Sequence, residues 1–334
     1  MDLSAPTRPL VISMGDPTGI GPEVTAKAWQ ALCHGPTPFC VLGDPALYSS
    51  VPTQPISEVS EAPQVFCDAL PVLKGFEAPG VVVGQPNPAH AGVILGAIEH
   101  GVDLVLSGQA LALVTAPIAK SVLMAAGFSH PGHTEFLGAL LATTPFEQTR
   151  GPVMMLAVEG LRVVPVTIHC ALSEVPSRLT QEAIVHAALV TAEALQRDLG
   201  LKAPRLVVAA LNPHAGEDGA FGDEEARVIA PAVAALQAMG LQVRGPLPAD
   251  SLFHSEARAT FDAAICMYHD QALIPLKALD FWGGVNATLG LPIIRTSPDH
   301  GTGFDIAGRG IARAESMIAA IQMAAAMAHG RMTS

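Results

Sequence analysis

Residues 14–24 read MGDPTGIGPEV and follow a short apolar run, PLVIS, at residues 9–13. The segment after the glycines, TAKAWQALC at 25–33, has helical spacing, so the whole stretch predicts a strand, a glycine-rich turn and a helix. Such a turn usually offers backbone N–H groups to an anion. Its glycines match neither the dinucleotide fingerprint G-x-G-x-x-G nor the P-loop pattern G-x-x-x-x-G-K-[ST]. The turn therefore indicates an α/β protein and leaves its ligand open.

The rest of the chain alternates short β-rich apolar runs with alanine-rich segments of helical period. The runs that predict strands include residues 39–43, 81–84, 111–117, 161–169, 205–214 and 262–270. The segments that predict helices include residues 89–108, 177–200, 223–240 and 307–330. Strands separated by helix-length segments favour a mostly parallel sheet with helices on its faces. Residues 44–80 are rich in proline and serine and give no clear assignment.

Composition restricts the classes of function. Half of the 334 residues are hydrophobic, which suits one large α/β unit or two subdomains with a buried core. A formal net charge of -12, without any long Lys/Arg run, argues against nucleic acid and anionic membrane as partners. The five cysteines form no C-x-x-C pair, and we find no signal-peptide pattern and no uninterrupted membrane span. We therefore expect a soluble, acidic protein of the cytoplasm.

Three histidines share one local context, because each stands where a predicted strand ends. His169 ends VVPVTIH, His214 follows LVVAALNP, and His269 follows AAICMY. Ligands of open α/β sheets bind at this edge. Three imidazoles from three strand ends suit a catalytic metal with open positions, with zinc, cobalt or manganese fitting better than magnesium. Asp270 is placed to orient a neighbouring ring, and three ordinary histidines bonded to nearby backbone are the alternative.

A second group of candidates is cationic. Lys277, Asn286 and Arg295 follow His269 at intervals of 8, 9 and 9 residues, in a chain with only 18 Lys and Arg. A lysine, an amide and a guanidinium that converge on one point would bind a phosphate or a carboxylate. The alternative is a set of surface cations that do not converge.

Two further stretches have the character of site loops. HPGHTEFL at 130–137 places His133 and Thr134 at the start of a predicted helix, with Thr134 as its N-cap and SHPG as a tight turn before it. RTSPDHGTGFDIAGRG at 295–310 is rich in glycine and aspartate and leads into the last predicted helix. Its composition suits close approach of a ligand to the backbone.

Several motifs occur in one order along the chain: MGDPTGIGPEV, TAPIAK, HPGHTEFL, TIH, LNPHAGEDGAFGDEE, GPLPAD, YHDQALIPLK and LPIIRTSPDHGTGFDIAG. Together they resemble the PdxA family, the 4-hydroxythreonine-4-phosphate dehydrogenases of vitamin B6 synthesis. The resemblance runs from about Val11 to Arg309, although residues 52–88 match no motif. That family is related to the isocitrate and isopropylmalate dehydrogenases, which carry a similar turn after their first strand and bind NAD(P) without the usual fingerprint.

The resemblance implies an isopropylmalate dehydrogenase-like fold: two α/β subdomains with a mostly parallel sheet and an active-site cleft between them. We place the first subdomain at roughly residues 1–130 with 298–334 and the second at roughly 131–297. The resemblance also implies a homodimer whose active sites are shared between subunits.

Site residues are carried over from the family position by position. The divalent-metal ligands, which come from both subunits, would be His169, His214 and His269. The substrate-binding residues would be His133, Thr134, Lys277, Asn286 and Arg295. The catalytic candidates, among which the sequence does not rank a general base, are Asp250, Asp270 and Lys277. The cofactor-binding residues, from the first turn and from a loop at 299–308, would be Gly15, Asp16, Asp299, Gly301, Gly303 and Asp305.

The implied reaction is oxidation of 4-phospho-L-threonine at its C3 hydroxyl by NAD or NADP, with one divalent metal in each site. The resulting β-keto acid loses CO2 to give 3-amino-2-oxopropyl phosphate. The choice between NAD and NADP depends on a charge near the ribose 2′-oxygen and stays open.

Four alternatives accompany this reading. A dehydrogenase of D-erythronate or D-threonate 4-phosphate shares the phosphate and the metal site. The aromatic cis-dihydrodiol branch is disfavoured, because it lacks the triplet that stands here as His133, Thr134 and Glu135. A non-catalytic binding protein for a metal and a phosphometabolite could use the same scaffold. A phosphoryl- or acyl-transferase on a related fold would not need the three histidines.

Overall fold

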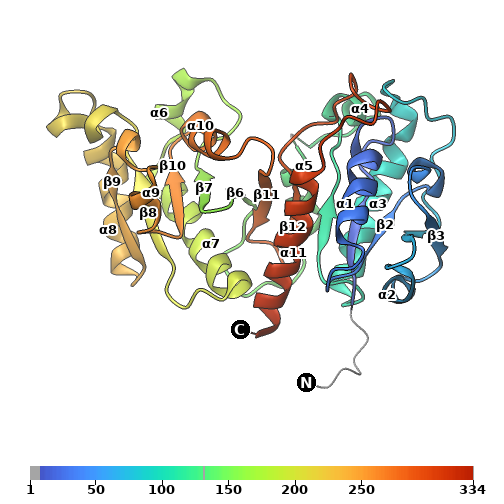
Figure 1. Cartoon of the computed structure of the whole chain (residues 1–334). Helices are drawn as coiled ribbons and strands as arrows, with labels where there is room; N and C mark the ends of the chain where they lie inside the picture. The colour runs from blue at the N-terminus through green and yellow to red at the C-terminus, as the bar shows by residue number, and fades with distance from the viewer. Residues whose placement is uncertain (1–7, 131, 334) are drawn as a thin grey trace. The chain divides into compact units, whose positions relative to one another are not determined.

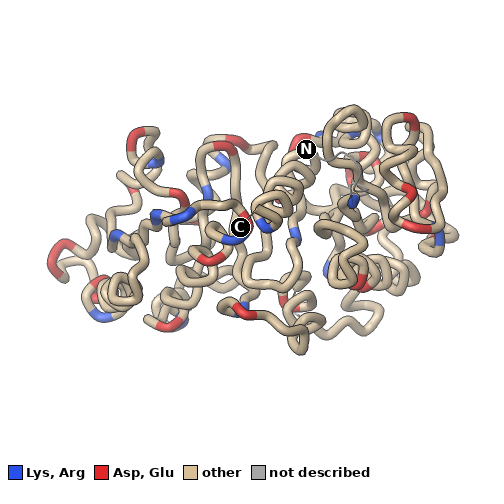
Figure 2. The backbone as a smooth tube through the Cα atoms, turned by 90° about the horizontal axis from the view of Figure 1, so that it is seen from below, with Lys and Arg blue, Asp and Glu red and all other residues tan. Residues whose placement is uncertain are grey.

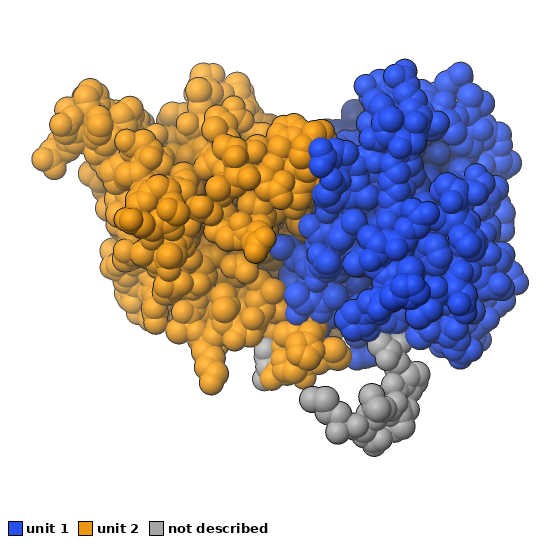
Figure 3. All heavy atoms as spheres, in the orientation of Figure 1, with its two compact units in different colours: residues 1–144, 292–328 blue, residues 145–291, 329–334 orange. Residues whose placement is uncertain are grey.

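The structure is a computed structural model that describes residues 8–130 and 132–333. The chain divides into two compact units, unit 1 with residues 1–144 and 292–328 and unit 2 with residues 145–291 and 329–334 (Figure 3). The expected boundary before residue 131 differs from this division, because α5 (His133–Leu140) lies in unit 1. Phe136 of α5 packs on Phe128 with ring centroids 5.2 Å apart, which attaches the helix to unit 1. Residues 1–7 and Pro131, which the expected boundaries include, lie outside the described residues.

Unit 1 is built on a parallel sheet. Its strands lie in the order β3 (Thr53–Ile56), β4 (Leu70–Leu73), β2 (Phe39–Leu42), β1 (Leu10–Ser13), β5 (Leu113–Thr115) and β12 (Arg295–Pro298). Its helices are α1 (Gly21–Leu32), α2 (Ala62–Val65), α3 (Ala91–Leu106), α4 (Lys120–Ala125), α5 and most of α11 (Glu315–Thr333) (Figure 1). Strand β1 is buried along its whole length, as its apolar sequence predicts. Because β1 and β5 run parallel, Asp16, which follows β1, and Thr115, which ends β5, both lie at the carboxyl edge of this sheet.

Helix α3 is tightly packed on the sheet of unit 1. Among the described residues, Pro88–Leu106 is the one helical segment that is long and apolar enough to cross a membrane, which a core helix can equally be. Ile94, Ile98 and Val102 are buried at helical spacing. A Cβ at Gly101 would lie 2.7 Å from Leu113 Cδ1 of β5, so a larger residue here would have to displace that leucine side chain. These contacts are those of a helix that covers a sheet.

Unit 2 is built on a mixed sheet. Its strands lie in the order β11 (Val285–Leu289), β6 (Val153–Val158), β7 (Leu161–Pro165), β10 (Ala263–Cys266), β8 (Arg205–Ala209) and β9 (Gln242–Leu247). Strand β6 runs antiparallel to both neighbours, and the other pairs are parallel. The helices are α6 (Val175–Arg178), α7 (Gln181–Leu199), α8 (Ala230–Ala238), α9 (Ser255–Arg258) and α10 (His269–Leu279), with a π-helical turn at Glu225–Ile229. Short 3-10 turns in the two units are Pro45–Tyr48, Val59–Glu61, Pro88–His90, Leu172–Glu174 and Ala249–Ser251, and Pro213–Gly219 is a turn of left-handed backbone.

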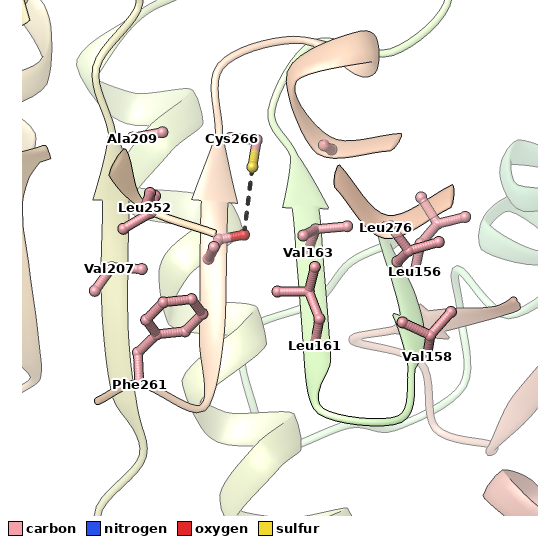
Figure 4. Packing of buried hydrophobic residues seen from close by; sticks show 12 residues of the cluster. Leu156, Val158, Leu161, Val163, Val207, Ala209, Leu252, Phe261, Cys266 and Leu276 are labelled. Carbon is pink, nitrogen blue, oxygen red and sulfur yellow. Dashed lines mark hydrogen bonds between the residues drawn. The ribbon is translucent and has the colours of Figure 1, made fainter. Parts of the chain in front are cut away.

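An apolar cluster on one face of the unit 2 sheet anchors α10. Val163 of β7, Val207 of β8 and Cys266 of β10 all point into it (Figure 4). Ala272 and Leu276 of α10 belong to the same cluster and are fully buried. Burying a leucine side chain contributes about 1.5–3 kcal/mol to stability. The cluster therefore fixes the helix that begins at His269.

The fold class predicted from the sequence, α/β with a mostly parallel sheet, is confirmed. The strand predicted at residues 81–84 is wrong: this segment is a loop in which Val82 and Val83 are half exposed. It pairs with no strand because Gly80 and Gly84 on either side adopt positive φ. The unassigned stretch at 44–80 contains β3 and β4, and the last helix begins at Glu315 rather than at residue 307.

Charged residues are dispersed over the backbone. Lys and Arg are interspersed with Asp and Glu in both units (Figure 2). The described residues contain no long cationic run of the kind that binds nucleic acid.

Candidate functional site

A buried guanidinium lies at the centre of the polar residues of unit 1. Arg295, the first residue of β12, is only 3% exposed. Its Nε and Nη2 donate to Oγ1 of Thr115 at 3.1 and 2.6 Å, and Nη2 lies 3.1 Å from Nδ1 of His133. Burial lowers the pKa of Arg295 to about 9, so the group is still cationic at neutral pH. One chain thus assembles two of the predicted substrate-binding residues, Arg295 and His133.

The hydrogen bond from Arg295 determines the tautomer of His133. A guanidinium only donates, so Nδ1 of His133 accepts and the proton of the neutral ring resides on Nε2. Burial, and then the charge of Arg295, hold the pKa of His133 well below 6.5, so the ring is neutral at pH 7. Nε2 is buried and has no partner. An unsatisfied buried donor costs about 1–3 kcal/mol, which an incoming ligand oxygen would recover.

Thr134 has a different place from the predicted one. The N-cap of α5 is Gly132, in extended conformation, and Thr134 lies inside the first turn. With Thr134 as the N-cap the helix would begin at Glu135, whereas it begins two residues earlier at His133, so that prediction is wrong. The tight turn predicted at SHPG includes Pro131, which is outside the described residues.

The glycine-rich turn uses its own backbone donors internally. The N–H of Thr18 donates to Oδ1 of Asp16 at 3.0 Å, and the N–H of Gly19 donates to the carbonyl of Asp16 at 3.1 Å. The N–H of Ile20 donates to the carbonyl of Thr302 at 2.8 Å. These three donors of the turn are therefore already used within the chain. Oδ2 of Asp16 is buried without a partner and can accept a hydrogen bond from a ligand.

Two of the glycines instead allow close packing of loops. A Cβ at Gly19 would lie 2.6 Å from the carbonyl oxygen of Thr302. Gly15 has a φ of +69°, and its Cβ would collide with the carbonyl oxygen of Pro117. The turn thus fits directly against the loop at 299–308 and against the residues after β5.

A cavity of about 640 Å³ lies between these loops within unit 1. Its lining includes Gly19 from the first turn, Gly308 from the loop at 299–308, and Asp44 and Val83 from segments without a predicted role. A cavity of this volume is in the range of cofactor sites. None of the six predicted cofactor-binding residues lines it: Gly15, Asp16, Asp299, Gly301, Gly303 and Asp305. Gly301 faces open space, and Asp305 is exposed.

In unit 2 two of the predicted metal ligands lie side by side. His169 follows β7 and His269 begins α10, and their ring centroids are 5.9 Å apart. Nδ1 of His269 lies 2.7 Å from Oδ1 of Asp270, which is the contact that the predicted orienting role of Asp270 requires. With Nδ1 donating to the carboxylate, Nε2 of His269 has the lone pair that a metal needs. Both histidines line an open cavity of about 450 Å³.

The third histidine is not brought to the other two. His214 lines a second cavity, of about 650 Å³, together with Asp250 and Asp270. The described part of the chain contains no group of three or more His, Cys, Asp or Glu close enough to hold a metal. The donors are of the right kind for a divalent cation, and a single chain does not assemble three of them.

The remaining predicted residues of unit 2 lie on two elements. Lys277 is in α10, where its Nζ lies 5.3 Å from the ring centroid of Phe281. Asn286 is in β11, and its Oδ1 is buried without a partner.

Sequence reasoning missed two site residues. Thr115, the partner of Arg295, belongs to the TAPIAK motif, which was the signal available for it. Tyr268 lines both the cavity of His169 and His269 and the cavity of His214, and only its position before His269 indicated it.

Comparison with known proteins relates the whole chain to one family. The model of the family described as "Pyridoxal phosphate biosynthetic protein PdxA" matches residues 36–324. A 4-hydroxythreonine-4-phosphate dehydrogenase of Caulobacter vibrioides is 61% identical over 97% of this chain and 99% of its own length.

Solved structures agree with this relationship. The crystal structure of 4-hydroxythreonine-4-phosphate dehydrogenase from Klebsiella pneumoniae has a TM-score of 0.84 and 38% identity, and covers 96% of this chain and 99% of the other. A terephthalate 1,2-cis-dihydrodiol dehydrogenase from Burkholderia xenovorans is more distant, with a TM-score of 0.65 and 27% identity over 96% of this chain and 98% of the other. The family match and the identity over nearly the full length lead to one conclusion: this chain belongs to the PdxA family.

Proposed function

We propose that this chain is a 4-hydroxythreonine-4-phosphate dehydrogenase that acts in vitamin B6 biosynthesis. It oxidises the C3 hydroxyl of 4-phospho-L-threonine with NAD or NADP, and the β-keto acid then loses CO2 to give 3-amino-2-oxopropyl phosphate. The observation that carries the proposal is the Arg295–Thr115–His133 cluster, in which a buried cation lies beside a buried donor without a partner. The name of the Caulobacter vibrioides relative supports the choice of substrate.

The chain's own residues account for binding of the anionic end of the substrate. Arg295 supplies a positive charge, and Nε2–H of His133 supplies a directed hydrogen bond that does not depend on protonation near pH 7. A phosphate or carboxylate oxygen satisfies both. Thr134, Lys277 and Asn286 are proposed to contact the same substrate, and the buried Oδ1 of Asn286 suits a substrate donor such as the amino group.

His169, His214 and His269 are proposed to hold the divalent cation, with Asp270 orienting His269. When bound, such a cation supplies Lewis-acid chemistry that favours ionisation of a hydroxyl and polarises a carbonyl. Asp250, Asp270 and Lys277 are the candidates for the base that accepts the hydroxyl proton. Because His214 lies in a different cavity from His269, we propose a homodimer in which the second subunit completes the set. A cytoplasmic location is part of the proposal.

The cofactor is proposed to bind in unit 1, at the cavity bordered by Gly19 and Gly308. NAD(P) supplies the hydride acceptor, and the chain supplies position and a surrounding field. Asp16, Asp299 and Asp305 do not line this cavity, and their proposed role in cofactor binding rests on the two loops that carry them.

An absorbance assay tests the proposal. The purified protein is mixed with 4-phospho-L-threonine and NAD or NADP, with and without a chelator, and formation of reduced cofactor is followed at 340 nm. We expect rapid, chelator-sensitive reduction. D-erythronate 4-phosphate and D-threonate 4-phosphate run in parallel, and activity with these two alone would reassign the substrate. No reduction with any of the three after addition of metal would favour a binding protein.

Mixed dimers test the shared site. His214→Ala and His269→Ala are each expected to be inactive. If the two histidines of one site come from different subunits, co-refolded variants recover about a quarter of wild-type activity, because one site of each mixed dimer is intact. No recovery from verified mixed dimers would place both histidines of a site in one chain.

A further inference from the structure

Three polar side chains are buried beneath the strand ends that carry the histidines of unit 2. Thr167, Gln271 and Glu225 are 7%, 8% and 6% exposed. Burial of a polar group is unfavourable unless hydrogen bonds compensate for the lost water. None of these residues has a role in the proposed reaction, so their contacts require another explanation.

Gln271 connects the ends of β10 and β8. Its Oε1 accepts the N–H of Met267 at 2.7 Å, and its Nε2 donates to the carbonyl of Ala210 at 2.7 Å. Met267 lies two residues before His269, and Ala210 lies four residues before His214. Because both ends of the amide are used, one side chain fixes the separation of the two segments.

Thr167 connects the end of β7 to the same point. Its Oγ1 donates to the carbonyl of Met267 at 2.7 Å, and its N–H donates to that carbonyl at 3.2 Å. Thr167 lies two residues before His169. The carbonyl of Met267 therefore accepts from Thr167, and its N–H donates to Gln271. These bonds hold together the segments before His169 and His269.

Glu225 fixes the segment that leads to His214. Its Oε1 accepts the N–H groups of Leu211 at 2.8 Å and Asn212 at 2.7 Å. Its Oε2 accepts Nδ2 of Asn212 at 3.0 Å. His214 itself has a φ of +52°, a left-handed conformation that costs a non-glycine residue about 1–3 kcal/mol. Such a conformation persists where its surroundings determine it, and Glu225 determines where this turn begins.

We infer that Thr167, Gln271 and Glu225 act as one buried brace that sets the relative positions of His169, His269 and His214. The three are positioning residues, because each acts through backbone and touches no imidazole. The inference rests on the proposed function in one respect, that these histidines hold a divalent cation. Loss of residues that support metal ligands typically weakens metal binding 10–100-fold, and we expect this range for the brace.

The test measures binding of Co²⁺ alone to the chelator-treated protein, by titration of its visible absorption. Gln271→Met keeps the length of the side chain and removes both hydrogen bonds, and we expect Co²⁺ affinity to fall 10–100-fold. Sedimentation verifies that the variant has the oligomeric state of the wild type.

A matched pair of threonines separates positioning from general stability. Thr167 and Thr191 each donate a buried hydroxyl to a backbone carbonyl, at 2.7 and 2.6 Å, but Thr191 lies within α7, bonds to Ala187 of the same helix, and joins none of the segments that lead to His169, His214 and His269. Thr167→Val and Thr191→Val should lower the unfolding temperature similarly. Only Thr167→Val should weaken Co²⁺ binding, and Thr167→Ser, which keeps the hydroxyl, should restore it.

The outcomes distinguish the brace from the proposed metal site. The metal site stands if the wild type binds Co²⁺ and His214→Ala does not. The brace is wrong if, in that case, Gln271→Met and Thr167→Val bind Co²⁺ like the wild type. Equal weakening by Thr191→Val also overturns the brace, since stability would then explain the effect. If the wild type does not bind Co²⁺, both the metal site and the brace are wrong.

Discussion

The two sheets carry polar residues of opposite character: in unit 1 a buried group around Thr115 at the end of β5, which we call the buried edge, and in unit 2 exposed histidines after β7 and β10, which we call the open edge. In unit 1, Arg295 is 3% exposed and bonded to Thr115 and His133 within the same chain. In unit 2, the side chains of His269 and Asp270 are 37% and 69% exposed and face open cavities. A buried cation needs all its partners in place when the chain folds, whereas exposed imidazoles do not. One chain thus prepares a site for an anion, and its proposed cation site is open.

Large apolar residues are exposed on α10 and just after its end. Helix α10, which begins at His269, also carries Ile274, which is 66% exposed. Phe281 and Trp282 follow the helix, 60% and 48% exposed, with ring centroids 5.0 Å apart. Exposed apolar groups of this size are typical of protein interfaces. They support the proposal that a second subunit covers the unit 2 histidines.

The largest expected effect is at the open edge. His214→Ala should lower kcat at least about 1,000-fold, because the lost Lewis-acid stabilisation is several kcal/mol and each 1.36 kcal/mol is tenfold in rate. The variant should also lose Co²⁺ binding. Its dissociation constant for a phosphate-bearing inhibitor, measured directly by a binding assay, should be unchanged. Turnover assays and the cobalt titration measure the two effects. An active variant without bound metal would contradict the assignment of His214.

A change at the buried edge should act on the substrate instead. Arg295→Lys removes the planar donors that reach Thr115 and His133, and hydrogen bonds to charged groups contribute about 1.5–3 kcal/mol. We expect KM for the phosphorylated substrate to rise about 10–100-fold, with Co²⁺ affinity unchanged. The control is Arg227→Lys, whose guanidinium is exposed and paired with Asp223. An unchanged KM in Arg295→Lys would show that this cluster is structural.

The sequence located the open edge better than the buried one. His169, His214 and His269 were recognisable because each follows an apolar run, a local pattern. The Arg295–Thr115 and Arg295–His133 contacts join residues 180 and 162 positions apart. No short stretch of sequence indicates that these three residues meet. The neutral state of His133 also has no local pattern, because it depends on burial in the folded chain.

The missed strands have the same cause. Strand β6 at Val153–Val158 joins β7 through Glu159 and Gly160, and it pairs antiparallel with the distant β11. A search for parallel strands alternating with helices does not expect a hairpin there. The prediction at residues 81–84 is wrong in the opposite sense: three valines in a row resemble a strand, but glycines with positive φ at positions 80 and 84 place them in a loop.

The neutral imidazole of His133 gives a smaller effect on stability. Its pKa lies well below 6.5 in the folded state because of burial, and the unfolded chain has the ordinary value. Between these values the unfolded state binds the additional proton, so stability is fully present above about pH 6.5 and declines as pH falls below it. We expect His133→Gln to reduce this decline, as measured by urea unfolding at pH 7.5 and 5.5. An equal decline in the variant would mean that other groups cause it.

The smallest effect is expected at the opposite edge of the unit 2 sheet, which carries none of the three histidines of the proposed metal site. Asp262, before β10, accepts Nη2 of Arg205 at 2.9 Å, and chiefly this hydrogen bonding lowers the pKa of Asp262 below 3.8. A lowered carboxyl pKa stabilises the fold above the ordinary value, and that contribution is lost as pH falls through the folded value. Asp262→Asn should therefore lower the unfolding temperature at pH 7 and lower it less at pH 2.5. The effect should be slight at pH 7, because Arg205 is exposed and solvent screens the pair. Differential scanning calorimetry at the two pH values measures this difference. Loss of activity in Asp262→Asn at pH 7 would mean that the two edges of the sheet are coupled, and that the open histidines depend on more than the brace beneath them.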